Sequence, residues 1–194
     1  MGKSIKRSVG IRVACAIVAI FLFSGMTTMN ILRIEGTQSD SVRATNMLEQ
    51  VQQAETAHYK WSANLSNALY SGTEFTGSKD HTGCVLGKWL YSEMSLTDSE
   101  IEALRTQIEP LHKELHASAD VVLGMYENSH SRAQQYYQET IQANLTNLVG
   151  LLDKVVERGG ALSDEYIAQM NNTIAFMHIS TVVCLILAMV ALIS

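Results

Sequence analysis

Four residues in the middle of the chain, His58, Cys84, His112 and His116, carry the imidazole and thiol groups that zinc prefers as ligands. His112 and His116 are four residues apart, so on a helix their rings project from one face and can share an ion. Three imidazoles and one thiolate fill a tetrahedral site. Because a catalytic zinc keeps one position open, a filled tetrahedron indicates a structural or sensory site. The sequence therefore predicts bound Zn²⁺ and no catalytic residue.

The segments that hold these residues have the periodicity needed to bring them together. Around His58, residues recur at spacings of three and four that line one face of a helix, so the imidazole is expected to point inward. The stretch 104–123 holds the other two histidines and is rich in Leu, Glu, Lys and Ala with the same spacing. Cys84 begins an apolar and aromatic segment, 84–91. We expect this segment to form a short helix that packs over the metal and shields it from water.

The segment 112–116 does not match two catalytic zinc motifs. In the metalloprotease helix a glutamate directly follows the first histidine, whereas here the glutamate is Glu114, two positions after His112. The Pro-Cys-x-x-Cys segment of zinc deaminases does not occur later in the sequence. We therefore expect that the protein is not an enzyme.

Two uncharged segments bracket the four candidate ligands. One comprises the twenty residues between Arg12 and Arg33, and the other runs from Thr173 to Ser194. Each has about the length of a helix that crosses a hydrocarbon core of about 30 Å. The first is longer than the apolar core of a secretion signal and lacks a small-x-small cleavage site after Phe23, which favours a retained anchor. We predict transmembrane helices at 13–33 and 173–194.

The charges around these segments predict an orientation. Lys and Arg gather at positions 3, 6, 7 and 12, ahead of the first segment. Because cytoplasmic flanks carry an excess of positive charge, residues 1–12 are expected in the cytoplasm and residues 34–172 outside it.

The region between the two segments is acidic. Residues 34–173 hold all nineteen Asp and Glu of the chain and nine of its fourteen Lys and Arg, a formal charge of minus ten. Such a surface argues against a nucleic-acid partner and mildly favours cations. Screening limits this attraction to about 8–10 Å at physiological salt, so it cannot specify one metal.

Cysteine usage fits this organisation. Cys15 and Cys184 lie within the predicted membrane helices, so Cys84 is the only thiol of the region between them. A disulfide framework within that region is therefore excluded. Zinc would hold Cys84 as a thiolate, and the thiolate is also a candidate for selective oxidation.

The fold class predicted from the sequence is all-α. The chain has one proline, no alternating strand pattern and few turn clusters. A helix is expected from Glu35 to about Tyr70, followed by a polar, glycine-bearing loop at 71–80. A further joint is expected at 127–130. Together the helices predict an antiparallel, four-helix-like bundle flanked by two transmembrane helices.

Capping and breaking residues predict further helix boundaries. Thr97 with Glu100 matches a capping box at the start of a helix. Pro110 suits the first turn of another helix, so a boundary is expected there. Gly159-Gly160 is expected to end a helix, with Ser163 starting the last one.

Three segments carry a family resemblance: His58-x-x-Trp61, Cys84-x-Leu86-Gly87-Lys88-Trp89-Leu90-Tyr91, and Glu109-Pro110-Leu111-His112-x-x-x-His116. In residue types and spacing they resemble the chemoreceptor zinc-binding domain, CZB, over roughly residues 51–152. In that family the metal ligands are the first histidine, the cysteine and the histidine pair. The resemblance assigns these roles to His58, Cys84, His112 and His116.

The resemblance implies a sensory role. CZB-like motifs occur in transmembrane methyl-accepting chemotaxis receptors, which are homodimers, and in some diguanylate cyclases. By this resemblance we expect a bacterial inner-membrane protein with a periplasmic or extracellular sensory domain at 34–172. Zinc occupancy, or the redox state of Cys84, would alter helix packing and be relayed across the membrane. No HAMP linker or cytoplasmic signalling region follows Ser194, so a longer receptor or a partner chain is expected to supply the output.

Two other functions stay open from the sequence. Zinc could staple a membrane-anchored bundle, or the protein could buffer zinc as an accessory to another protein, without signalling in either case. A staple should loosen or unfold when zinc is removed, because binding and folding free energy are then the same quantity. A sensor should instead change shape.

Overall fold

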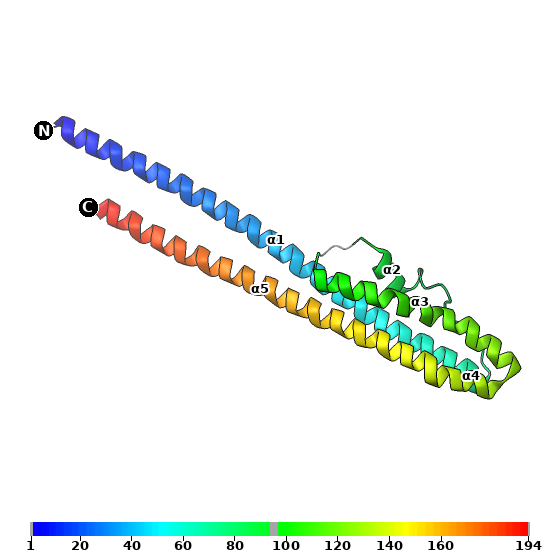
Figure 1. The fold of residues 1–194 in the computed structure, drawn as a ribbon. Coiled ribbons are helices and arrows are strands. Elements are labelled where there is room, and N and C mark those ends of the chain that lie inside the picture. Colours follow the sequence, from blue (N-terminus) through cyan, green and yellow to red (C-terminus); the bar gives the residue numbers. More distant parts are fainter. Residues whose placement is uncertain (1, 94–96, 194) are drawn as a thin grey trace. The chain divides into compact units, whose positions relative to one another are not determined.

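The computed structural model describes residues 2–93 and 97–193, and all elements in these ranges are helical (Figure 1). The all-α prediction is therefore confirmed. The chain divides into two compact units: Val42–Ser163, here called the bundle unit, and Met1–Ser41 with Asp164–Ser194, here called the apolar unit. The elements in chain order are α1 (Gly2–Ser71), α2 (Val85–Tyr91), α3 (Ser99–Asn128), α4 (His130–Tyr136), the π-helix η1 (Tyr137–Ile141) and α5 (Gln142–Ile193).

The bundle unit is built from three long helical runs and the short helix α2. The side chain of Gln134 in α4 bonds the carbonyl of Leu69, and Gln142 in α5 bonds Ser62, so α4–η1–α5 runs antiparallel to α1. Because α3 runs in the same direction as α1, the chain must return between them, and the segment 72–93, which contains α2, runs back along the bundle (Figure 1). Fully buried aliphatic side chains fill the interior, among them Leu65, Leu86, Ile101, Ile108, Leu115, Ile141, Leu148 and Leu152.

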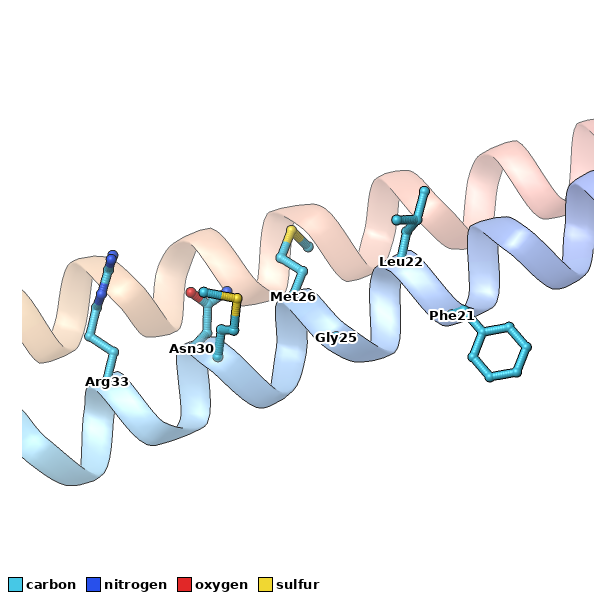
Figure 2. A pocket seen from close by; sticks show the side chains of 7 residues that line it. Phe21, Leu22, Gly25, Met26, Asn30 and Arg33 are labelled. Atoms are coloured by element: carbon cyan, nitrogen blue, oxygen red, sulfur yellow. The ribbon is translucent and has the colours of Figure 1, made fainter.

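The apolar unit exposes large hydrophobic side chains. Phe21 is 74% exposed and Leu22 is 70% exposed, and both project from α1 (Figure 2). The helices α1 and α5 each contain a stretch long and apolar enough to cross a membrane. Exposed apolar surface of this extent is costly in water and is typical of contact with lipid or protein.

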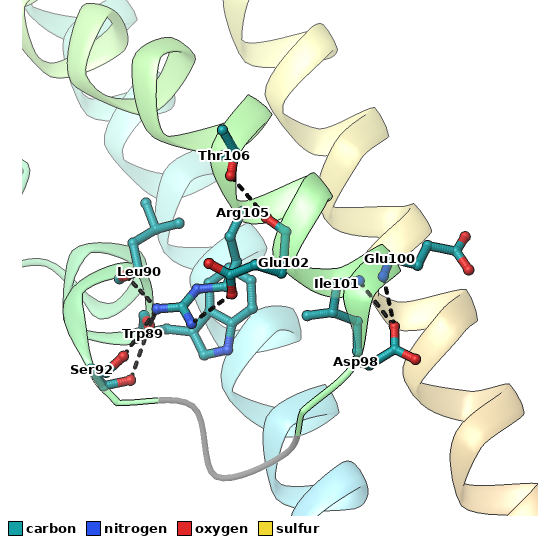
Figure 3. A network of polar contacts seen from close by, with 9 residues as sticks. All are labelled: Trp89, Leu90, Ser92, Asp98, Glu100, Ile101, Glu102, Arg105 and Thr106. Atoms are coloured by element: carbon teal, nitrogen blue, oxygen red, sulfur yellow. Dashed lines mark hydrogen bonds and ion pairs between the residues drawn. The ribbon is translucent and has the colours of Figure 1, made fainter.

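The N-terminus of α3 shows why one predicted cap was wrong. The capping side chain is Asp98, whose Oδ1 accepts hydrogen bonds from the amides of Glu100 at 3.1 Å and Ile101 at 3.0 Å (Figure 3). Thr97, the predicted cap, precedes it. Asp98 also accepts a 2.7 Å hydrogen bond from Arg158 of α5. A carboxylate satisfies the helix amides and the guanidinium at once, which a threonine hydroxyl cannot do.

Two predicted boundaries do not occur. Helix α3 continues through Pro110, and α5 continues through Gly159-Gly160 and Ser163. A proline inside a helix leaves one carbonyl without its amide partner, but the buried Ile108 and Leu115 on either side hold this stretch of α3 in the core. At Gly159 a Cβ atom would lie 2.8 Å from side-chain atoms of Met47 and Leu48. This glycine therefore permits close packing of α5 on α1 within the bundle. The joint predicted at 127–130 does occur, between α3 and α4.

The Asp98 cap gives a first testable prediction. Asp98→Ala removes the cap and the ion pair with Arg158, and we expect it to lower the free energy of unfolding by about 1–3 kcal/mol. The Arg158 guanidinium holds the pKa of Asp98 below its usual range. This contribution is therefore present above pH of about 4 and is lost as the pH falls through the lowered pKa.

Thermal denaturation followed by circular dichroism at neutral and acidic pH measures the effect. The control is Glu102→Ala, which removes a side chain that is 61% exposed and a long ion pair of 3.7 Å with Arg105. This variant should change stability by less than about 0.5 kcal/mol. Equal stability of Asp98→Ala and the control at neutral pH would contradict the assigned role of Asp98.

Candidate metal centre

Three elements of the bundle unit bring the four predicted residues to one place. His58 lies on α1, His112 and His116 lie on α3, and Cys84 is the N-cap residue of α2. One ligand atom from each residue, a ring nitrogen or the sulfur, lies within 4.8 Å of every other. The four residues are thus positioned to bind one metal ion.

The spacing of the ligand atoms suits a small tetrahedral ion. His58 Nε2 and His116 Nε2 are 3.3 Å apart, and Cys84 Sγ is 3.1 Å from His112 Nε2. Bond lengths of 2.0–2.1 Å to nitrogen and 2.3 Å to sulfur give a zinc tetrahedron edges of roughly 3.3–3.7 Å. These two pairs are close to such edges, and all four ligand atoms lie within 4.8 Å of one another. Side-chain shifts of about 1 Å would therefore bring the four atoms to zinc distances.

The histidines lie deep inside the bundle. His112 is 0% exposed, and His58 and His116 are each 2% exposed. The indole of Trp61 packs 5.5 Å from the His116 ring and also meets Phe75 edge to face, with ring centroids 5.6 Å apart. Trp61 thus covers the His116 side of the cluster, and Phe75 packs behind Trp61.

Backbone carbonyls orient two of the three imidazoles. His58 Nδ1 is 2.7 Å from the carbonyl of Ala54, and His116 Nδ1 is 2.9 Å from the carbonyl of Ser78. The Ser78 carbonyl also accepts a 2.8 Å hydrogen bond from the indole of Trp61. With the proton on Nδ1, the lone pair of Nε2 faces the centre of the cluster, as a metal-bound histidine requires. His112 Nδ1 differs, because it is buried with no hydrogen-bond partner among the described residues.

Burial sets the protonation states of the cluster. It lowers the pKa of His112 to about 3 and that of His116 to about 4, and it also lowers the pKa of His58. Burial raises the pKa of the Cys84 thiol. At neutral pH the three imidazoles are therefore neutral and able to donate a lone pair. The thiol is protonated before the metal binds and must release its proton on binding.

This difference predicts how zinc affinity depends on pH. Between roughly pH 6 and pH 8 only the thiol proton is displaced, so the apparent dissociation constant should rise about tenfold for each unit of pH decrease. His112 and His116 add no slope there, because their pKa values of about 3 and about 4 lie below this range, and burial also lowers the pKa of His58. Competition with a chromophoric chelator, corrected for the chelator's own protonation, measures the slope. A slope of two or more protons would show that the histidines are charged in the metal-free protein.

The segment around Cys84 is held in a defined position. Cys84 Sγ accepts a 3.2 Å hydrogen bond from the amide of Gly87 and lies 3.6 Å from the carbonyl of His81. At Gly87 a Cβ atom would collide with the backbone carbonyls of His81 and Thr82. The first turn of α2 therefore packs directly on the 81–82 backbone, and this packing fixes the sulfur.

Arg105 of α3 anchors the other end of α2. Its Nη2 atom donates hydrogen bonds to the carbonyls of Trp89 at 3.1 Å, Leu90, and Ser92 at 3.0 Å (Figure 3). The guanidinium also lies 5.3 Å from the centroid of the Trp89 ring. Because α3 also carries His112, one helix positions both the histidine pair and the helix that holds the cysteine. The sequence pattern did not single out Arg105, although its spacing of seven from His112 places both on one face of a helix.

His81 lies beside the cluster and is not part of it. The centroid of its ring is 6.2 Å from that of His112 and 6.1 Å from that of Tyr91. Its backbone carbonyl, and not its imidazole, faces the cysteine sulfur. The four ligand residues complete a tetrahedron without it, so His81 is a nearby histidine outside the ligand set.

Comparison with known proteins identifies the segment that contains the cluster. Residues 58–123 match the family model of the chemoreceptor zinc-binding domain, CZB. The matched segment begins at His58 and includes Cys84, His112 and His116. No curated protein and no solved structure matches the chain. The matched segment and the cluster agree, and the chain thus carries a zinc-binding CZB domain at residues 58–123.

Proposed function

We propose that this protein is a membrane-anchored sensor in which zinc occupancy, or the redox state of Cys84, controls the packing of α1 against α3. The main support is the origin of the candidate ligands. His58 comes from α1, whereas His112 and His116 come from α3. A bound ion would therefore tie the two helices together, and loss of the ion or oxidation of Cys84 would release this tie.

A membrane anchor is supported by the two apolar stretches. Helix α1 carries both His58 and the uncharged residues 13–32, and α5 carries the second uncharged stretch. A change in the packing of α1 in the bundle unit would act on a helix that also enters the membrane. We propose that the output is a shift or rotation of the spans, read by a cytoplasmic module or by a partner chain. As in the receptors that the sequence resembles, we propose that the protein acts as a homodimer.

We place the CZB domain outside the cytoplasm of a bacterial cell, on the charge bias of residues 1–12. Domains of this family are typically cytoplasmic, so topology is the first property to measure. Alkaline phosphatase fused after Asn128 should be active, and green fluorescent protein fused after Ser194 should be fluorescent. An inactive phosphatase fusion together with a non-fluorescent C-terminal fusion would reverse the topology while leaving the zinc site as described.

We propose binding and signalling as the activity, with no catalysis. A cluster of three imidazoles and one thiolate offers four ligands, which leaves no open position for a substrate or an activated water. The same cluster would suit a structural staple, so the experiment must separate the two roles.

Hydrogen exchange of the full chain in lipid nanodiscs, with zinc or with chelator, makes this separation. A sensor should change protection at 34–41 and 164–172, outside the bundle unit, while the bundle stays folded. A staple should lose protection across the bundle unit when zinc is removed. His112→Ala is the control, since it should show the same exchange with and without zinc. No zinc-dependent change outside the bundle unit would reject the relay.

A further inference from the structure

An elongated groove in the apolar unit is not explained by the zinc site. It has a volume of about 490 Å³, and its lining includes Phe21, Leu22, Gly25, Met26, Asn30 and Arg33, all from α1 (Figure 2). One end is polar and the other is apolar. Gly25 contributes no side chain, and nothing lies within 4 Å of the position that its Cβ would occupy. The groove is therefore open along the face of the helix.

The polar end presents hydrogen-bond donors without a matching acceptor. Asn30 is 9% exposed, and its Nδ2 has no hydrogen-bond partner among the described residues. Arg33 follows one turn later on the same face, and none of the described residues that line the groove is acidic (Figure 2). A buried amide without a partner is costly. A guanidinium beside such an amide is complementary to an anionic oxygen group such as a phosphate.

The length of the groove matches one leaflet of a bilayer. From Phe21 to Arg33 the helix rises about 18 Å, and half of a hydrocarbon core is about 15 Å. Arg33 is the first charged residue after the uncharged segment 13–32, which places it at the level of lipid headgroups. Phe21 and Leu22 lie near the middle of that segment, at the level where acyl chains end.

We infer that this groove binds one phospholipid with an anionic headgroup. Arg33 and the Asn30 amide receive the phosphate, and an acyl chain lies along Met26, Gly25 and Leu22. The inference rests on the proposal that α1 spans the membrane. Binding would fix the interfacial end of the same helix that carries His58.

The test uses the full chain purified in a mild detergent, after carbonate extraction has shown that it is integral to the membrane. Native mass spectrometry then counts the lipid molecules retained from phosphatidylglycerol and from phosphatidylcholine. We expect one retained phosphatidylglycerol, bound about tenfold to a hundredfold more tightly than phosphatidylcholine. Arg33→Gln should lose this preference, and Asn30→Leu should weaken it. The matched control is Arg12→Gln, which removes the same charge at the other end of the segment and should retain the lipid.

Three outcomes would overturn the inference. Equal retention of the two lipids, or retention unchanged in Arg33→Gln, would show that the groove does not read the headgroup. Displacement of the lipid by inorganic phosphate alone would assign the polar end to a free anion. Cross-linking of two copies through this face without bound lipid would assign the groove to a dimer contact. Extraction of the protein by carbonate would instead refute the membrane anchor itself, a failure distinct from the other three.

Discussion

His112→Ala is expected to abolish stoichiometric zinc binding and to lower zinc affinity by about a hundredfold or more. Structural zinc sites contribute about 10–16 kcal/mol of binding free energy. Shared among four ligands, this is roughly 3 kcal/mol for each, which corresponds to about two orders of magnitude in the dissociation constant. His112 is fully buried and its Nε2 lies 3.1 Å from Cys84 Sγ, so no solvent-exposed group can replace it without rearrangement.

The measurement is the zinc content of the full chain after dialysis, followed by competition with a chelator of known affinity. His81→Ala is the matched control, because it removes an imidazole 6.2 Å from His112 by ring centroids that is outside the cluster. It should keep one zinc per chain. Cys84→Ser should lose zinc as His112→Ala does, since a hydroxyl is a poor substitute for a thiolate. Full zinc content in both His112→Ala and Cys84→Ser would reject the assigned ligands.

The buried histidines also make the stability of the metal-free protein depend on pH. Burial lowers the pKa of all three imidazoles, so each is neutral in the folded state at a pH where the unfolded chain would begin to take up protons. The sign of the linkage follows: their contribution to stability is present above pH of about 6.5 and is lost as the pH falls toward the lowered pKa values. The metal-free bundle is therefore expected to be acid-sensitive, and zinc should extend its range to lower pH.

The sequence was sufficient to select the four residues because two kinds of local information pointed to them. The spacing of His112 and His116 is a property of one helix, and the spacing of residues around His58 is a property of another. The residue pattern around Cys84 completed the set. What the sequence could not supply is the distance between segments separated by 26 or more positions in the chain, which depends on how α1, α2 and α3 pack.

The errors at Pro110 and Gly159 have a common physical origin. Both residues are local signals of a helix end, but both lie where packing in the bundle outweighs the local preference. Gly159 is required by the close approach of α5 to Met47 and Leu48, a contact that no local pattern contains. Arg105 was missed for a similar reason, since its three carbonyl partners lie 13 to 16 positions away, in the last turn of α2 and at its C-cap residue. Local sequence identified the ligands, whereas tertiary contacts determine the residues that position them.

Gly87→Ala is expected to impair zinc binding although residue 87 is not a ligand. Its Cβ would lie against the carbonyl oxygens of His81 and Thr82, and the added atom meets backbone, which cannot rotate away as a side chain can. Either α2 or the 81–82 turn must therefore move. Because Cys84 lies between these two segments in the chain, its sulfur would move with them. The amide of Gly87 would then also lose its 3.2 Å hydrogen bond to Cys84 Sγ. We expect zinc affinity to fall about tenfold or more, the equivalent of at least 1.4 kcal/mol.

The matched control is Gly150→Ala, also within a helix, where nothing lies within 4 Å of the added Cβ. In an exposed helix position alanine is favoured over glycine by about 1 kcal/mol, so this control should keep its zinc and gain slightly in stability. The two variants make the same chemical change, but only Gly87→Ala is predicted to lower zinc affinity. Cobalt substituted for zinc reports the thiolate bond through its charge-transfer absorption, and this band should weaken in Gly87→Ala alone. Unchanged cobalt spectra and zinc affinity in Gly87→Ala would show that the position of α2 does not control the cysteine ligand.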